Sequence, residues 1–230
     1  MVRIVGRYFY PDKRVNIFVG PLGSGKTELA VNTALVLAEK SPVTLADLDV
    51  INPYYRVRRV KAELAARGVN VVCPPDEVSP ADVPALPPAI SAVLVRDDLR
   101  GVFDVGGDDI GARVLGRFRP YLPAGQYAVF FVVNTCRLKA TVTDIHRMVD
   151  RVEHAARVRI NYLVNNTNLG LETEAATVMA GRRMLERVVR ERQVPLAFTG
   201  VRAELAKDVR ALDPETPVLP LNLFMRPPWE

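Results

Sequence analysis

Seven short apolar runs alternate along the chain with longer amphipathic stretches. The runs are rich in Val, Ile and Phe and almost continuously apolar, as is typical of strands covered on both faces. They are VNIFVG (15–20), VTLADLD (43–49), VNVVCP (69–74), GVFDVGG (101–107), YAVFFVVN (127–134), INYLVNN (160–166) and VPLAFTG (194–200). This alternation predicts an α/β fold with a mainly parallel central sheet of about seven strands.

The stretches between the runs show helical periodicity. Residues 141–158 place Ile145 and Val149 on one face, opposite charged side chains, and Thr141 or Thr143 is suited to cap this helix. The same pattern covers residues 27–40 and 173–193. We therefore expect helices to separate most of the strands.

The chain composition indicates one folded domain. Hydrophobic residues make up 49% of the 230 residues, which is enough for a sizeable core. The proline-rich segment 74–88 predicts a surface loop ahead of a helix near 89–99, and strand patterns lie on both sides of it. We therefore expect residues 1–230 to form a single domain.

The chain lacks the usual signals for export or membrane insertion. Charges and a proline interrupt the N-terminal residues, and no apolar run is long enough to span a bilayer. Cys73 and Cys136 are the two cysteines, and they are far apart. These features predict a cytoplasmic, reducing location. The formal net charge of +5 permits an anionic partner, although a solvated basic surface is the simpler interpretation.

The stretch GPLGSGKT, residues 20–27, fits the pattern G-x-x-x-x-G-K-[ST] between an apolar strand and a helix. Glycines let backbone N–H groups point inward around an anion, and the helix N-terminus adds partial positive charge. We expect Lys26 to reach the β- and γ-phosphates and the Thr27 hydroxyl to ligate Mg²⁺. The predicted phosphate-binding residues are Gly20, Pro21, Leu22, Gly23, Ser24, Gly25, Lys26 and Thr27. The chain is therefore expected to adopt the three-layer P-loop fold.

Carboxylates at two strand ends suit the same chemistry. Asp104 ends an apolar strand, where it can hold Mg²⁺ through water, and Gly107 completes D-x-x-G, where a backbone N–H can sense a γ-phosphate. Asp47 and Asp49 alternate along another strand end, so one of them is expected to position the attacking water, with Asp47 favoured. The alternative is that both aspartates only solvate a loop.

Together GPLGSGKT, DLDVINP and FDVGGDD resemble the MinD/ParA group of P-loop ATPases within the SIMIBI class. The chain is similar to stand-alone bacterial ATP-binding proteins of the CobQ/CobB/MinD/ParA nucleotide-binding group. The resemblance implies ATP and Mg²⁺ as cofactors, slow hydrolysis, and a nucleotide-dependent homodimer that engages a partner. It also implies that Asn166, with Asn165 beside it, contacts adenine. The guanine-reading N-K-x-D is absent, because NNTN ends in Asn168, and this favours ATP over GTP.

The chain departs from this group at Pro21, where many members carry a lysine that reaches the partner's phosphates. Proline has neither charge nor a side-chain donor, so the role of that lysine does not carry over. Another cation has to take it over, or hydrolysis is very slow. Arg56, Arg58 and Arg59 are candidates, and a solvated arginine face is the alternative.

Several partner classes remain open at this stage. Prolines near the end of the sequence disfavour a membrane-binding helix there. Nonspecific DNA binding is an option, because GARVLGRFRPYL supplies three arginines, although a solvated basic helix is the simpler interpretation of them. An unknown protein is the other candidate partner. A small-molecule kinase or ATP-dependent ligase is the alternative activity. A metallochaperone ATPase is disfavoured, because the two histidines are interpreted as surface residues. The three arginines are Arg113, Arg117 and Arg119, and the two histidines are His146 and His154.

Overall fold

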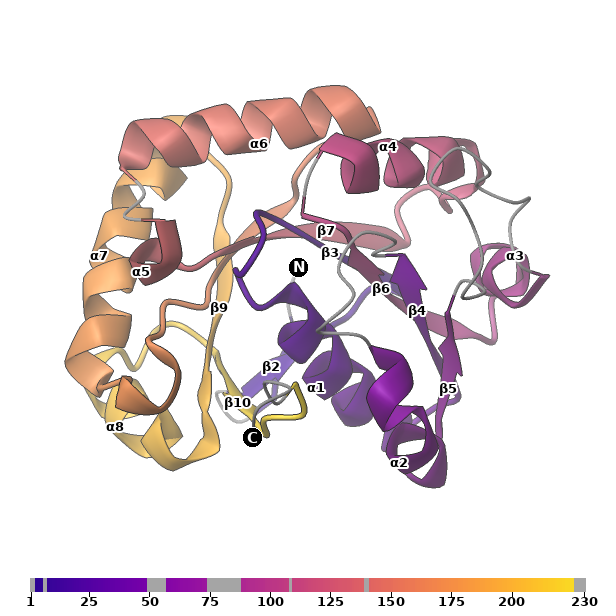
Figure 1. Cartoon of the computed structure of the whole chain (residues 1–230), viewed down its shortest axis with the longest axis horizontal. Coiled ribbons are helices and arrows are strands. Elements are labelled where there is room, and N and C mark those ends of the chain that lie inside the picture. Colours follow the sequence, from indigo (N-terminus) through magenta and orange to yellow (C-terminus); the bar gives the residue numbers. More distant parts are fainter. Residues whose placement is uncertain are drawn as a thin grey trace.

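The computed structural model describes residues 3–5, 8–48, 57–73, 88–107, 109–138 and 141–225. Ten strands within these residues form one sheet in the order β1-β2-β10-β9-β8-β7-β3-β6-β4-β5 (Figure 1). β1 and β2 pair antiparallel, and all other neighbours are parallel. The strands are β1 Arg3–Val5, β2 Tyr8–Tyr10, β3 Val15–Val19, β4 Val43–Leu48, β5 Val69–Val72, β6 Arg100–Val105, β7 Tyr127–Val133, β8 Tyr162–Asn165, β9 Leu196–Arg202 and β10 Val218–Leu221. The predicted mainly parallel α/β fold is confirmed.

The seven predicted strands correspond to β3 through β9, and the expected number was too small. The other three strands, β1, β2 and β10, extend one edge of the sheet. β10 contains Pro220 and is four residues long, so its sequence lacks the continuous apolar run that revealed the others. It is nevertheless paired along its length with β9, from Val218 opposite Thr199 to Leu221 opposite Arg202.

Helices cover both faces of the sheet. The side chains of Val15, Ile17 and Val19 join the hydrophobic core beneath α3, α4, α6 and α7, whereas Phe18 joins the core beneath α1 and α2. Thr141 caps α6 and forms a capping box with Asp144, which settles the choice left open by the sequence. The helices are α1 Lys26–Ala38, α2 Lys61–Ala66, α3 Pro88–Val95, α4 Asp109–Phe118, α5 Thr135–Leu138, α6 Val142–Ala156, α7 Ala175–Arg192 and α8 Ala206–Leu212, with 3-10 turns η1 Val57–Val60, η2 Arg119–Tyr121, η3 Gly170–Glu172 and η4 Ala203–Leu205.

The parallel register gathers the carboxyl ends of the central strands at one edge of the sheet. β3 lies between β6 and β7, and Phe18 of β3 is the partner of both Asp104 and Phe130. On the other side of β6, Asp47 of β4 is the partner of Asp104. Open α/β sheets bind ligands at this edge, so the fold itself indicates where a site lies. Within the described residues, no helix is both long and apolar enough to cross a membrane.

Candidate functional site

The loop of residues 20–25 joins β3 to α1 at this edge. Ser24 N–H donates to the carbonyl of Pro21 at 3.2 Å, which closes a tight turn. Gly25 has a φ of 88°, a conformation that residues with a side chain rarely adopt, and α1 begins at the next residue. Ser24 and Lys26 are buried, whereas the Leu22 side chain is exposed at the tip of the loop. The predicted phosphate-binding segment therefore forms a tight turn that leads into helix α1.

The side chain of Asn166 links this loop to the end of β8 by a hydrogen bond. Its Nδ2 donates a hydrogen bond to the carbonyl of Ser24 at 2.7 Å. A Cβ at Gly25 would overlap the same Asn166 nitrogen, so the glycine is required for the contact as well as for the turn. Asn166 is buried, and its backbone N–H donates to Val133 of β7 at 2.8 Å. The loop is thus held by the neighbouring part of the sheet.

Lys26 lies under the loop and beside Gly107. Its side chain is 5% exposed, and its Nζ donates to the carbonyl of Pro21 at 3.2 Å. A Cβ at Gly107 would be 2.9 Å from that Nζ and 2.7 Å from the backbone nitrogen of Leu22. The segment after β6 therefore packs directly against the loop, and only a residue without a side chain fits there.

Thr27 and Asp104 meet at the start of α1. The Thr27 hydroxyl donates to Asp104 Oδ2 at 2.6 Å, and Asp104 is 1% exposed. Asp47 is 2% exposed and sits opposite Asp104 on the adjacent strand. Burying carboxylates this close together is costly unless positive charge compensates them. Lys26 supplies one such charge near this edge, and the oxygen donors present are those that a hard divalent cation prefers.

The donor set suits Mg²⁺ better than a metal held by the protein alone. Mg²⁺ is usually bound through one or two carboxylates, with water and substrate phosphate completing its shell. In the described part of the chain, no group of three or more His, Cys, Asp or Glu side chains could hold a metal ion. The hydroxyl of Thr27 and the carboxylate of Asp104 fit a cation completed by phosphate oxygens.

Two of the asparagines after β8 have partners inside the fold. Asn165 is fully buried; its Nδ2 donates to the carbonyl of Val178 at 3.1 Å, and its Oδ1 accepts from Thr167 N–H at 3.2 Å. Asn168 Nδ2 donates to the carbonyl of Asn166 at 2.7 Å. These contacts hold the end of β8 and the segment after it within the fold, and contact with adenine stays a prediction for Asn165 and Asn166.

Arg137 is a residue of this site that the sequence analysis missed. It lies on α5, just after β7, and a Cβ at Gly23 would be 2.8 Å from its Nε. Asn134 holds the α5 turn in place, because its Oδ1 accepts from Cys136 N–H at 3.1 Å and from Asn168 N–H at 3.2 Å. The Arg137 side chain is exposed, and no ion pair involves it within the residues described. Its position just after an apolar strand was the available signal.

Of the three arginines proposed from the sequence, two lie in the 3-10 turn η1 and one falls outside the described residues. Arg58 and Arg59 belong to the 3-10 turn η1, where Arg59 is exposed. Arg56 and Asp49 fall outside the described residues, as does most of the proline-rich loop. Both cysteines are half-buried. Among these arginines, the structure shows a close approach to the loop for Arg137, at Gly23.

Comparison with known proteins supports the fold. No protein-family model and no curated protein sequence matches the chain. Cell division protein FtsY from Thermotoga maritima matches with a TM-score of 0.56 and 18% identity, over 87% of this chain and 64% of that structure. FlhF complexed with GMPPNP and Mg²⁺ matches with a TM-score of 0.53 and 14% identity, over 81% of this chain and 65% of that structure. FtsY from Elizabethkingia anophelis in complex with GDP matches with a TM-score of 0.50 and 18% identity, over 83% of this chain and 58% of that structure.

These matches show that the chain shares its fold with the FtsY and FlhF structures. The chain spans less than two thirds of the length of each of the three structures. The three-layer α/β fold expected from the sequence is confirmed. The narrower assignment to the MinD/ParA group finds no support in these FtsY and FlhF structures.

Proposed function

We propose that the protein binds a nucleoside triphosphate with Mg²⁺ and hydrolyses it slowly, with residues 1–230 acting as one nucleotide-binding domain. The observation that carries this proposal is the 2.6 Å contact between Thr27 and Asp104, beside a glycine-rich loop that covers a buried lysine. A hydroxyl at the start of a helix, a strand-end carboxylate and a lysine are the groups that P-loop proteins use to hold Mg²⁺ and phosphate.

The proposed roles follow from these positions. The backbone of residues 20–27 binds the phosphates, and Lys26 leaves the Pro21 carbonyl to contact the β- and γ-phosphates. Thr27 and Asp104 hold Mg²⁺, which compensates charge on the phosphates. Asp47 positions the attacking water, and the backbone of Gly107 senses the γ-phosphate; Asp49, which lies outside the described residues, is proposed from the sequence as a second residue for the water.

We propose ATP as the nucleotide, with Asn166 and Asn165 as the residues nearest the base. The support is chemical: a carboxylate accepts hydrogen bonds from guanine N1 and N2, and this chain has Asn168 where guanine-reading segments end in aspartate. The FlhF and FtsY structures described above hold GMPPNP and GDP, so a guanine nucleotide is the alternative to test.

Hydrolysis is proposed to control a homodimer that engages a protein or DNA partner. Pro21 provides no positive charge toward the phosphates, and Arg137 of α5 lies against Gly23 of the same loop. A guanidinium can bind phosphate oxygens through two parallel hydrogen bonds. Arg137 is therefore proposed to take over charge compensation within the same chain.

Binding of fluorescent ATP and GTP analogues, with and without Mg²⁺, tests the site. We expect the ATP analogue to bind more tightly, Mg²⁺ to strengthen binding, and Lys26→Ala to weaken it at least about tenfold. Lys207→Ala, which changes an exposed lysine on α8, is the matched control and should leave binding unchanged. Equal affinity of wild type and Lys26→Ala would refute the phosphate site, and tighter binding of the GTP analogue would refute ATP.

Light scattering with ADP and with a non-hydrolysable ATP analogue tests the switch. A change from monomer to dimer only with the ATP analogue, lost in Lys26→Ala, is the expected result. An unchanged mass with both nucleotides refutes the dimer. Turnover that requires an added metabolite would instead identify a small-molecule kinase or ligase.

A further inference from the structure

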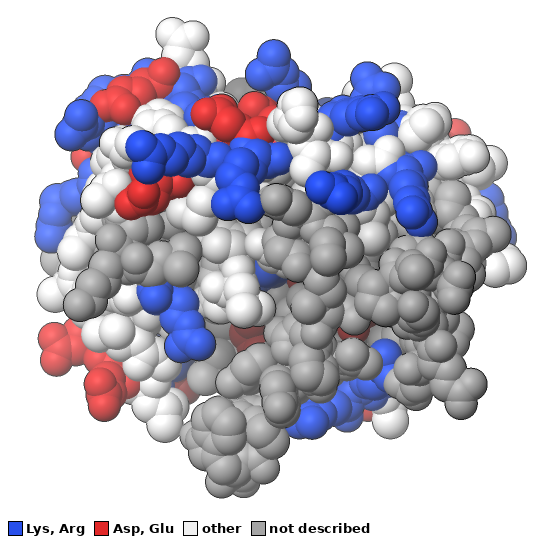
Figure 2. Space-filling view, turned by 45° about the horizontal axis from the view of Figure 1, so that its top comes forward, with Lys and Arg blue, Asp and Glu red and all other residues white. Residues whose placement is uncertain are grey.

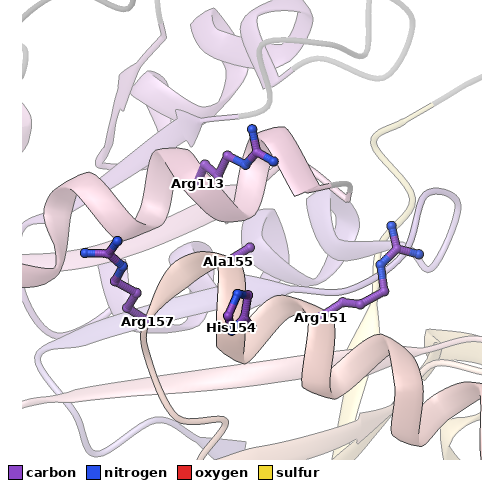
Figure 3. Close-up of a pocket in the computed structure, with 5 residues that line it drawn as sticks. All are labelled: Arg113, Arg151, His154, Ala155 and Arg157. Carbon is purple, nitrogen blue, oxygen red and sulfur yellow. The ribbon is translucent and has the colours of Figure 1, made fainter.

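A pocket of about 350 Å³ lies between α4 and α6, away from the P-loop. Figure 3 shows Arg113 on α4 and the other lining residues at the neighbouring end of α6. His154 and Ala155 occupy the middle of the view, and the three arginine side chains surround them. The lining residues are Arg113, Arg151, His154, Ala155 and Arg157. Among the residues that the structure describes, the lining therefore has three guanidinium groups and no acidic side chain.

Close packing of the two helices creates this arrangement. A Cβ at Gly116 of α4 would be 3.2 Å from the carbonyl oxygen of Ala155 and 3.3 Å from that of Ala156. Because Gly116 lacks a side chain, α4 can approach the last turn of α6, and Arg113 is one helical turn before Gly116. On α6, Arg151 is spaced three and four residues before His154 and Ala155, so the three share one face.

The acidic and the basic side chains of α6 lie on different flanks of the helix. Asp150 and Glu153 face α7, where Arg192 Nη2 is 2.6 Å from Asp150 and 3.6 Å from Glu153. The flank toward α4 carries the arginines. Figure 2 shows Lys and Arg side chains in a band across the face that holds α4 and α6, with acidic side chains mainly at its left end. Within the described residues, Arg113 and Arg157 take part in none of the ion pairs.

We propose that this pocket binds a small dianionic phosphate, as free phosphate or as a phosphomonoester. Guanidinium groups match phosphate oxygens in geometry, and pockets for small ligands begin at about 300 Å³. The C-terminus of α6 opposes an anion with only about half a negative charge. Arg113 and Arg157 alone outweigh that charge, and Arg157 occupies the helix end itself.

The proposed site is separate from the nucleotide site. Its lining residues come from α4 and the end of α6, and none belongs to residues 20–27. α4 nevertheless starts at Asp109, two residues after Gly107, which packs against the P-loop. A phosphate held at Arg113 therefore binds the helix whose N-terminal end adjoins the nucleotide site.

The chain has two histidines, and both can be followed by NMR. His154 lines the pocket, whereas His146 contacts Glu191 at 2.7 Å and serves as an internal control. We would titrate full-length protein with inorganic phosphate and with glycerol 3-phosphate, at fixed pH and ionic strength. The expected result is a saturable shift of the His154 ring C–H signal, with the His146 signal unmoved.

Substituting the arginines that line the pocket distinguishes a specific binding site from a general effect of salt. Arg113→Gln and Arg157→Gln are each expected to weaken the saturable shift at least about tenfold. Arg147→Gln is the matched control, because Arg147 is an exposed arginine of α6 outside the pocket, and should change nothing. All three side chains are exposed, and thermal unfolding verifies that the variants fold.

A linear shift without saturation, or equal binding by both pocket variants and wild type, would overturn the proposal. Two further ligands distinguish the source of the phosphate. Dimethyl phosphate, a diester with one charge, is expected to bind more weakly than glycerol 3-phosphate. Duplex DNA that moves the His154 signal at a lower phosphate concentration than glycerol 3-phosphate would overturn the small-dianion assignment and identify a nucleic-acid backbone site.

Discussion

The carboxylate of Glu28 gives the structure a pH-dependent element next to the P-loop. Glu28 follows Thr27 in the first turn of α1 and is buried. It accepts hydrogen bonds from the backbone N–H groups of Phe224 and Met225, the latter at 3.0 Å. Burial raises the pKa of Glu28 from 4.5 to about 6, and it outweighs the two N–H groups, which lower it.

The raised pKa determines the sign of the pH effect. The folded chain holds a proton that the unfolded chain releases near pH 4.5, so Glu28 contributes most to stability below that pH. This contribution is lost as the pH rises through about 6. At about 1.36 kcal/mol per pKa unit, ionising Glu28 costs the fold about 2 kcal/mol by pH 7.5.

Glu28→Gln removes the titration and keeps a side chain of similar size. We would measure the free energy of unfolding by urea for wild type and variant from pH 4 to 7.5. The wild type is expected to lose about 2 kcal/mol relative to Glu28→Gln across this range. Other titrating groups cancel in the difference between the two chains. A difference that stays constant with pH, or that favours the wild type as the pH rises, would refute the reasoning.

Three further substitutions test the site. Asp104→Asn is expected to abolish most of the strengthening of nucleotide binding by Mg²⁺, and a titration showing an unchanged Mg²⁺ effect would contradict the assigned role. Gly25→Ala is expected to lower the free energy of unfolding in urea by more than about 1 kcal/mol, and by more than Gly68→Ala does. Both glycines have positive φ, but Gly68 has no atom within 4 Å of its Cβ position. Equal losses would show that the Asn166 contact adds nothing. Arg137→Gln is expected to lower nucleotide turnover at least about tenfold, and unchanged turnover in a phosphate-release assay would exclude it from charge compensation.

The central sheet was predictable because its strands are buried on both faces. β3 and β7 are almost entirely apolar, so their sequence pattern has few competing interpretations. The strands at one end of the sheet carry less information: β1 is three residues long, and β10, which lies between β2 and β9, includes Pro220. A strand of three residues is too short to show a pattern, and a proline interrupts an apolar run, so local sequence does not identify these strands.

The candidate site was predictable where one local segment forms it. The P-loop pattern includes its own turn, helix start and hydroxyl, and the Thr27–Asp104 contact follows from the parallel register of β3 and β6. Arg137 was missed because its contact with Gly23 joins positions that are remote in the sequence. The orientation of Asn166 toward Ser24 is likewise a tertiary outcome that its position after β8 does not fix.

The first turn of α1 joins two contacts that the sequence presents as unrelated. Lys26, Thr27 and Glu28 are consecutive, so the groups proposed to meet phosphate and Mg²⁺ share a rigid helical turn with the carboxylate that holds residues 224–225. One turn later, Asn32 Nδ2 donates to the carbonyl of Asn222 at 3.0 Å, and its Oδ1 accepts from the N–H of the same residue at 2.9 Å. Any displacement of this turn when phosphate enters the loop therefore moves the partners of residues 222–225 directly, with no intervening element. The pH dependence of Glu28 and the affinity for nucleotide are for this reason expected to be linked, with nucleotide shifting the pKa of Glu28 and pH shifting nucleotide affinity by the same free energy.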